Sequence, residues 1–446
     1  MTLAIIFLIL YLIALTIITF VSSRRETDSE YINSAKDLTA TESAFTTFAS
    51  LLTGYNFVIG VTFAYLYGFW YLMAFVGAGF AFIVLYFFYK KKLLPLQKEF
   101  NLLSIGDYFG LKYGKLSRFS VNIILLGGLL LFLVLQLFIN TGLFSSLLGI
   151  GKISALLLTT GVVGLYLWFG GFKASIKTDI FQGVLMLPII LTIFVFPIHF
   201  TVEKIPSAFD LSQFWFAIGL ALLQFFSLLG QAESFQRVFA SRNVKSLKKG
   251  LIIAFVLLVL VAGSIAYLGI NFRFAGIMTD PSNLFTDGVL GALPKWLGSL
   301  LAVSLIAAFM GTIDSSAFAF GALAASLKSV DKLSVKFTRI YMLVGVFVSA
   351  IASLYLFSFL SSVFALISIV SVIGAALLSS FIFKLKPFEI NAFLLTGILV
   401  FILGLVFKFI TDNPLTAIIP SAAALVALLL VMGGQKLLGG KKPSVV

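Results

Sequence analysis

The ten residues Ala307-Ala308-Phe309-Met310-Gly311-Thr312-Ile313-Asp314-Ser315-Ser316 lie near the middle of an apolar stretch that runs from Trp296 to Leu327. A stretch of this length can cross a bilayer as a helix. A charged side chain at membrane depth costs roughly 2.5 kcal/mol or more, and such residues usually face an internal cavity or an ion path. The stretch therefore predicts a membrane helix with a functional carboxylate at Asp314.

The composition of the whole chain is that of a membrane protein. Its 446 residues are 61% hydrophobic and 11% charged, whereas globular proteins carry about 25% charged residues. Apolar segments of roughly 20 residues occur near residues 2–21, 42–66, 69–89, 118–148, 153–170, 178–198, 212–230, 250–271, 296–326, 338–357, 359–383, 390–408 and 415–433. The sequence thus predicts an all-α integral membrane protein with about 13 transmembrane helices. These form a single transmembrane domain at 1–433, which a tail at 434–446 follows.

Positive charge is distributed unevenly over the predicted loops. The formal net charge is +14, and with the N-terminus placed outside, 26 of the 31 Lys and Arg residues fall in inner segments. This asymmetry follows the positive-inside rule, so the charge does not indicate a nucleic-acid partner. It predicts a multi-pass protein of the cell membrane with an outer N-terminus and a cytoplasmic C-terminus.

Small and polar residues interrupt the second predicted span, where Thr53-Gly54-Tyr55-Asn56 lies in mid-membrane. A broken helix is tolerated there only if its freed backbone groups face protein or a water-filled cavity. The alternative is a helix-packing face of small residues. Neutral polar side chains on several spans either line a shared cavity or bond to neighbouring helices. These candidate substrate-binding residues are Thr53, Tyr55, Asn56, Gln136, Asn140, Gln224, Ser227 and Ser368.

Two motifs make the chain resemble the sodium/solute symporter family. Gly170-Gly171-Phe172-Lys173-Ala174 with Thr178, Asp179 and Gln182 looks like the family's GG-x-K-A-x(3)-TD-x(2)-Q signature, and residues 307–315 are similar to its A-A-x-M-S-T-x-D-S run. A weaker third match contains Gly230-Gln231 and Gln236-Arg237. The resemblance implies the leucine-transporter-type fold, with a five-plus-five inverted-repeat core. Repeat one would cover about 42–198 and repeat two about 212–383, with one extra N-terminal and two extra C-terminal helices.

The resemblance also implies a sodium site where the break in the second span meets the ninth helix. Its ligands would be the backbone carbonyls of Ala49, Leu52 and Ala308, together with the side chains at positions 311 and 312. Thr312 supplies a hydroxyl, but Gly311 stands where the family commonly has Ser. We expect the loss of this oxygen to weaken the site unless water fills the gap.

Some relatives hold a second sodium further along the same helix, and the matching residues here are Asp179, Asp314 and Ser315. Asp179 alone also suits a helix N-terminus, where the helix dipole favours negative charge. Two coupling models stay open. Either sodium binds at Thr312 and again near Asp314, or Asp314 carries a proton in place of sodium or beside it.

These observations predict a secondary active symporter that uses the sodium gradient, with Na+ as the coupling ion, to import a small polar organic solute by alternating access. No buried Arg or Lys is expected as a clamp for a carboxylate, which favours a polyol, a sugar, an amide or a zwitterion. A monomer would suffice for transport, and the oligomeric state is left open.

The alternatives are a proton-coupled carrier of the same fold, a membrane sensor domain and an intramembrane enzyme. An enzyme would need a paired acid and base, an activated nucleophile or a metal site. The chain has no Cys and a single histidine, His199, and Asp179 and Asp314 lie far apart in sequence. The sequence therefore predicts that the protein is not an enzyme.

Overall fold

The computed structural model describes residues 2–23, 31, 38–100, 102, 104–196, 211–276, 284–328, 334–355, 359–411 and 413–439. These residues are almost entirely helical, and the β pairing among them is an isolated bridge between Leu38 and Ser241. Eleven of the described helices are long and apolar enough to cross a membrane. The predicted all-α membrane fold is confirmed, whereas the count of thirteen spans is not. The ends of the predicted spans 178–198 and 338–357 lie outside the described residues.

The chain divides into two compact units, and the first comprises Met1–Val76, Leu129–Ile218 and Glu233–Phe359. Its helices are α1 (Thr2–Ser23), α3 (Ala40–Leu51), α4 (Gly54–Tyr67), η2 (Gly68–Leu72), part of α8 (Lys115–Leu148), α9 (Lys152–Phe169), α10 (Phe172–Met186), η4 (Leu187–Leu191), α11 (Thr192–Val195), η6 (Leu211–Gln213), the start of α13 (Phe214–Gly230), α14 (Ala232–Ala240), α15 (Val244–Phe274), η8 (Leu284–Leu290), α16 (Lys295–Lys328) and α17 (Val335–Ser353).

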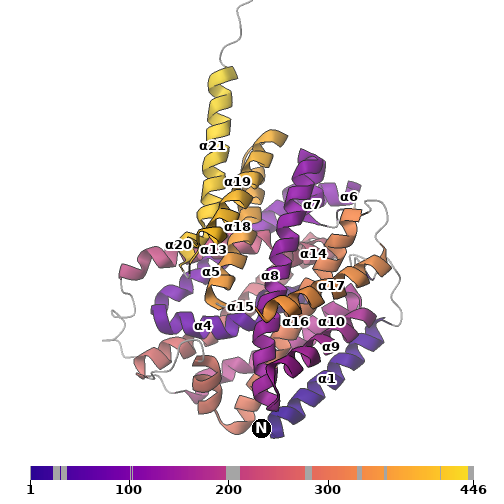
Figure 1. Cartoon of the computed structure of the whole chain (residues 1–446), viewed down its shortest axis with the longest axis vertical. Helices are drawn as coiled ribbons and strands as arrows, with labels where there is room; N and C mark the ends of the chain where they lie inside the picture. Colours follow the sequence, from indigo (N-terminus) through magenta and orange to yellow (C-terminus); the bar gives the residue numbers. More distant parts are fainter. Residues whose placement is uncertain are drawn as a thin grey trace, which may run out of the picture. The chain divides into compact units, whose positions relative to one another are not determined.

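Helix α16 is the centre of this first unit. It packs against α1, α3, α4, α9, α10 and α17, and Figure 1 shows α1, α9 and α10 beside it. Its residues Met310, Ile313 and Ala317 are fully buried in a hydrophobic cluster that also contains Leu8 and Leu15 of α1. Because the middle of α16 is covered by other helices, its polar residues Thr312, Asp314 and Ser315 are buried in protein.

The predicted break in the second span is confirmed. Helix α3 begins with a capping box between Thr39 and Glu42 and ends at Leu51. Leu52 has φ −86° and ψ 81°, Thr53 is extended, and α4 starts at Gly54. A second interruption, which the sequence did not predict, separates α13 from α14 at Gln231.

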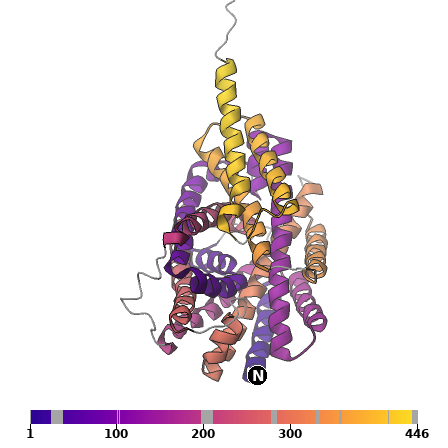
Figure 2. The same cartoon turned by 60° about the vertical axis from the view of Figure 1, so that its left-hand side comes forward.

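The second unit comprises Gly77–Gly128, Gly219–Ala232 and Leu360–Val446. It contains most of α5 (Met73–Phe88), η3 (Tyr89–Leu93), α6 (Leu94–Phe100), α7 (Ile105–Tyr113), the first part of α8, the end of α13, α18 (Phe359–Ile382), α19 (Pro387–Val406), α20 (Pro414–Ala417) and α21 (Ile419–Gly439). The yellow α21 runs along α19 in Figure 2. Since α21 continues to Gly439, the first residues of the predicted tail 434–446 are helical, and residues 440–446 lie outside the described part.

Glycines bring α13 and α18 into close contact within the second unit. A Cβ atom on Gly374 would lie far inside van der Waals distance of the backbone oxygen of Phe226. One on Gly230 would similarly overlap the backbone oxygen of Val370. Each unit draws on both halves of the chain, so this grouping does not test the inverted repeats, which stay a prediction.

Candidate functional site

The glycine pair of the signature motif shapes the start of α10. Gly170 ends α9 as its C-cap, and Gly171 is the N-cap of α10. The helix then buries Thr178, Asp179 and Gln182, with at most 1% of each residue exposed. All three polar residues of the motif therefore point into the protein, toward the neighbouring helices α1, α3 and α16.

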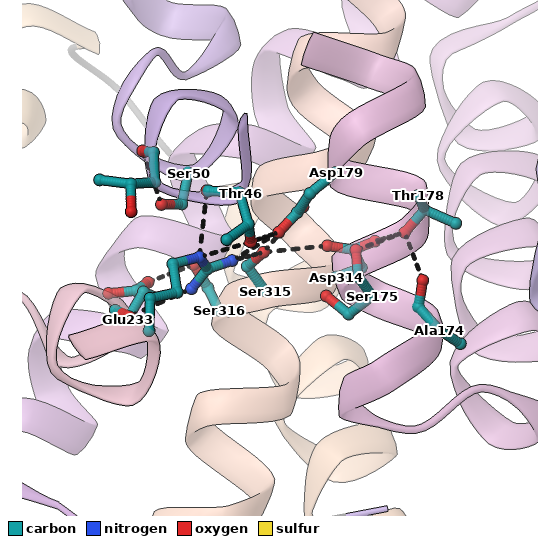
Figure 3. A network of polar contacts seen from close by, with 12 residues as sticks. Thr46, Ser50, Ala174, Ser175, Thr178, Asp179, Glu233, Asp314, Ser315 and Ser316 are labelled. Atoms are coloured by element: carbon teal, nitrogen blue, oxygen red, sulfur yellow. Dashed lines mark hydrogen bonds and ion pairs between the residues drawn. The ribbon is translucent and has the colours of Figure 1, made fainter. Parts of the chain in front are cut away.

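Asp179 forms a buried ion pair with an arginine from α14. The Nη2 atom of Arg237 lies 2.8 Å from Oδ2 of Asp179, and 2% and 0% of the two side chains are exposed. Thr46 of α3 donates its hydroxyl proton to the same Oδ2 atom. In Figure 3, Thr46, Asp179 and Ser315 point toward one another from α3, α10 and α16. The ion pair thus joins four helices of the first unit.

Arg237 makes further hydrogen bonds that leave its guanidinium well satisfied. Its Nε atom donates to the carbonyl oxygen and the hydroxyl of Thr46 at 3.1 and 2.9 Å. Its Nη2 atom donates to Oγ of Ser315 at 2.7 Å, and Nη1 donates to the carbonyl oxygen of Glu233 at 3.2 Å. The planar guanidinium fits several acceptors at fixed angles, which a lysine cannot do.

Asp314 lies beside this ion pair but has a different set of partners. Ser315 lies 3.1 Å from Oδ1 of Asp314 and 3.4 Å from Oδ1 of Asp179. Thr178 donates to Oδ2 of Asp314 at 3.2 Å. The two aspartates that are distant in sequence therefore lie within hydrogen-bond distance of the same serine hydroxyl, which can donate to one of them at a time, as Figure 3 shows.

A small pocket opens onto Asp314 and has room for about one water molecule or one small ion. Its lining includes Thr178, Ser175 and the glycine pair Gly170 and Gly171. Oxygen atoms from a carboxylate and two hydroxyl groups thus border a space of ionic size. A cation or proton site at Asp314 stays a prediction.

The formal charges of the cluster do not balance. Glu233 is a third buried carboxylate, 8% exposed, and accepts a hydrogen bond from Ser316 at 2.6 Å. If Asp179, Asp314 and Glu233 are all ionised, three negative charges face the single positive charge of Arg237. Buried charges are costly without compensation, so the cluster favours the uptake of a cation or a proton.

The predicted sodium ligands lie on α3, at the break that follows it, and on α16, which packs against α3. Ala49, Leu52 and Ala308 are fully buried, and Thr312 is 1% exposed. The Thr312 hydroxyl donates to the carbonyl oxygens of Ala308 and Phe309 at 2.8 and 3.0 Å. Its oxygen lone pairs remain able to bind a cation. Gly311 faces the side chain of Gln182.

Three of the predicted substrate-binding side chains in the first unit are buried polar groups. Within the described part of the chain, no hydrogen bond reaches the Thr53 hydroxyl, either amide atom of Gln136 or Oδ1 of Asn140. The Nδ2 atom of Asn140 lies 3.6 Å from the sulfur of Met310. Groups of this kind bind water or a polar ligand in native proteins.

Among the other predicted substrate-binding residues, the Ser368 hydroxyl is likewise buried, and no hydrogen bond reaches it within the described residues. Asn56 donates to the carbonyl oxygen of Leu51 at 2.8 Å, so it caps the end of α3. The side chain of Tyr55 lies outside the described part. Gln224, Ser227 and Ser368 belong to the second unit, where Ser227 donates to the carbonyl oxygen of Gln224 at 3.3 Å.

The sequence did not predict a buried arginine, but Arg237 is 2% exposed and is paired with Asp179. The prediction that no buried Arg or Lys is free to clamp a carboxylate of the solute stays a prediction. By sequence, Arg237 was only counted among the 26 positively charged residues of the inner segments. The useful signal was the spacing of Glu233 and Arg237, which lie four residues apart and share a helix face, directly after the interruption at Gln231. Thr46 was also missed, because nothing in its local sequence distinguishes it from a packing residue. Ser316 belongs to the stretch 307–316 that the sequence singled out, but no site role was predicted for it.

The comparison with protein families identifies the class of this chain. Residues 31–393 match the model of the sodium:solute symporter family, so the protein belongs to that family. Among curated proteins, the chain is 28% identical over 313 residues to a sodium/pantothenate symporter of Haemophilus influenzae and 27% identical over 248 residues to the high-affinity proline transporter PutP of Bacillus subtilis. The matched regions cover 64% and 49% of this chain, and 63% and 50% of those relatives.

A solved structure supports the fold. A Na+-coupled sialic acid symporter in a substrate-bound outward-open state superposes with a TM-score of 0.76. The match covers 96% of this chain and 97% of the other, at 17% sequence identity. The predicted leucine-transporter-type architecture is thereby confirmed.

Proposed function

We propose that this protein is a secondary active symporter that uses the sodium gradient to import a small polar organic solute by alternating access. The observation that carries the proposal is the unwound backbone at Leu52 and Thr53 in a helix that packs against α16. A break of this kind frees carbonyl oxygens inside the protein, and such carbonyls coordinate Na+ in transporters of this architecture.

The residues at the break suit a small hard cation. The carbonyls of Ala49, Leu52 and Ala308 and the hydroxyl of Thr312 are neutral oxygen donors in a fully buried region. Na+ bound there would hold α3 against α16. Its release would let the two helices separate, which supplies a physical link between the ion and the access of the solute site.

The nature of the solute follows from the polar groups of the first unit. Thr53, Gln136 and Asn140 offer a hydroxyl and two amides, which donate and accept hydrogen bonds without charge. Arg237 forms an ion pair with Asp179, so it is not free to bind a carboxylate of the solute. The groups favour a neutral or zwitterionic solute. Proline, a zwitterion, and pantothenate, a carboxylate monoanion, are the solutes named for the relatives. They are the first compounds to test, because the absence of a free cation among the described residues of the site favours the zwitterion over the anion.

The topology completes the proposal. The charge distribution supports a cell-membrane protein with an outer N-terminus and a cytoplasmic C-terminus, arranged as one transmembrane domain with two inverted repeats. One copy contains all the residues invoked, so a monomer would suffice. The partners would be the solute and the bilayer, without nucleic acid, and no enzymatic step is proposed.

A proton-coupled carrier is the second candidate, and Asp314 is the observation in its favour. Its carboxylate is fully buried, has hydroxyl partners and borders a pocket. A proton on Asp314 would remove one negative charge from the cluster as effectively as a sodium ion beside it.

Uptake into proteoliposomes distinguishes the two candidates. Solutes are screened with an inward sodium gradient and then with a proton gradient alone. We expect accumulation with sodium that is abolished when sodium is replaced by choline. Undiminished accumulation under the proton gradient without sodium would reject sodium coupling.

A further inference from the structure

The side chain of Gln182 fills the space that a side chain at position 311 would occupy. A Cβ atom built on Gly311 would overlap the amide oxygen Oε1 of Gln182 and would lie 3.1 Å from its amide carbon Cδ. Any side chain at position 311 is therefore incompatible with the present conformation of Gln182. The amide oxygen lies in the direction in which the missing side chain would project from α16.

The amide of Gln182 is bonded on one side only. Its Nε2 atom donates to the hydroxyl of Tyr11 at 3.0 Å. Its Oε1 atom is buried, and no hydrogen bond reaches it within the described residues. A buried amide oxygen without a donor is unfavourable, and the bond to Tyr11 directs the oxygen, not the nitrogen, toward α16.

We propose that Oε1 of Gln182 is a ligand of the sodium ion and replaces the oxygen that Gly311 cannot supply; this rests on the proposed function. Positions 308, 311 and 312 lie three and four residues apart, so they share one face of α16. An oxygen beside Gly311 on that face lies next to Ala308 and Thr312, the other donors of this helix. An amide oxygen is neutral and hard, like the backbone carbonyls of the site.

The inference also explains why Gly is present at position 311. Glycine in place of the family's common serine removes a ligand from α16. It also leaves the space through which the side chain of Gln182, on α10, reaches the same face of α16. The site would then join α3, α10 and α16, so that sodium binding would also depend on the position of α10.

Sodium binding to the purified full-length protein in detergent, without solute, tests the proposal. The melting temperature is followed as NaCl replaces choline chloride at constant ionic strength. We expect Gln182→Leu to raise the sodium concentration for half-maximal stabilisation about tenfold, which corresponds to about 1.4 kcal/mol. Tyr11→Phe is the matched control, because it removes the same hydrogen bond but keeps the oxygen. We expect it to change the sodium requirement by less than about threefold.

Two further variants keep the test decisive if Gln182→Leu does not fold. Gln182→Glu keeps an oxygen at the end of the same side chain, and we expect it to bind sodium at least as tightly as the wild type. The double variant Gln182→Ala with Gly311→Ser moves the oxygen back to α16, and we expect it to bind sodium more tightly than Gln182→Ala alone.

The outcomes separate the inference from the proposed function. If Thr312→Ala weakens sodium binding while Gln182→Leu does not, the sodium site is supported and Gln182 is not its ligand. A Gln182→Glu variant that binds sodium as weakly as Gln182→Leu would also overturn the inference. If neither Thr312→Ala nor Gln182→Leu alters sodium binding, the proposed site itself is wrong.

Discussion

Replacement of Arg237 by Met is the most informative perturbation of this structure. Methionine keeps much of the length of the side chain but removes the guanidinium, which bonds to Thr46, Asp179, Ser315 and the carbonyl oxygen of Glu233. Asp179, with no exposed surface, would then keep only hydroxyl donors. We expect a large loss of stability because a buried carboxylate would lose its counter-charge.

The size of the loss can be bounded from the geometry. At the observed 2.8 Å separation, an effective dielectric constant of about 20 gives an attraction of about 6 kcal/mol. In the variant, the hydroxyls of Thr46 and Ser315 would still bind the Asp179 carboxylate and would offset part of the lost attraction. Removing one member of a buried pair typically costs about 3–5 kcal/mol, and we expect Arg237→Met to fall in this range. Neutral hydrogen bonds between membrane helices average only about 0.6 kcal/mol, so the charge decides the outcome.

The free energy of unfolding, measured by titration with dodecyl sulfate in mixed micelles, is the assay. The matched control is Arg118→Met, which breaks an ion pair with Asp107 of the same 2.8 Å length but with 23% and 17% of the side chains exposed. We expect the control to lose about 1 kcal/mol or less. We also expect the double variant Asp179→Asn with Arg237→Met to recover more than half of the loss. A loss below about 1 kcal/mol for Arg237→Met, or a double variant no better than the single one, would refute the reasoning.

Two other substitutions test the role of Asp314 in cation dependence and the close packing of α13 against α18. Asp314→Asn removes one negative charge from the pocket, and we expect the sodium dependence of uptake to change in affinity or in Hill coefficient; an unaltered cation dependence would remove Asp314 from the site. Gly374→Val places a side chain against the backbone of Phe226, and we expect it to destabilise the protein by about 1–3 kcal/mol in the same titration. Gly433→Val, where an added Cβ would meet nothing within 4 Å, is the matched control, and an equal loss in both variants would contradict the packing argument.

The features that the sequence predicted well are those with a local physical cause. Apolar length is enough to find membrane helices, and the cluster Thr53-Gly54-Tyr55-Asn56 is enough to find the break, because such residues do not hold a continuous apolar helix. The buried state of Asp314 was also predictable, because it lies in the middle of an apolar span. Asp179 stands at the start of one, where the sequence also allowed a helix N-terminus.

The pairing of the polar groups was not predictable, because it depends on contacts between distant segments. Thr46 and Asp179 are separated by 133 positions, and Arg237 lies 58 positions beyond Asp179. The charge of Arg237 was consistent with an inner loop, since the positive-inside rule does not distinguish a loop residue from a buried one. Similarly, Gly311 predicted a missing ligand, whereas the oxygen that occupies its place comes from α10.

The hydroxyl of Ser315 lies between Asp314 and the ion pair of Asp179 with Arg237. Its oxygen accepts from Arg237, and its hydroxyl lies within reach of both Asp314 and Asp179, but it can donate to only one carboxylate at a time. A sodium ion or a proton at Asp314 would weaken that acceptor, so the hydroxyl would turn to Asp179 and reinforce the carboxylate that Arg237 binds. Under the proposed function, cation binding at Asp314 would therefore be thermodynamically coupled to the contacts among α3, α10, α14 and α16, and the coupling would act equally in both directions.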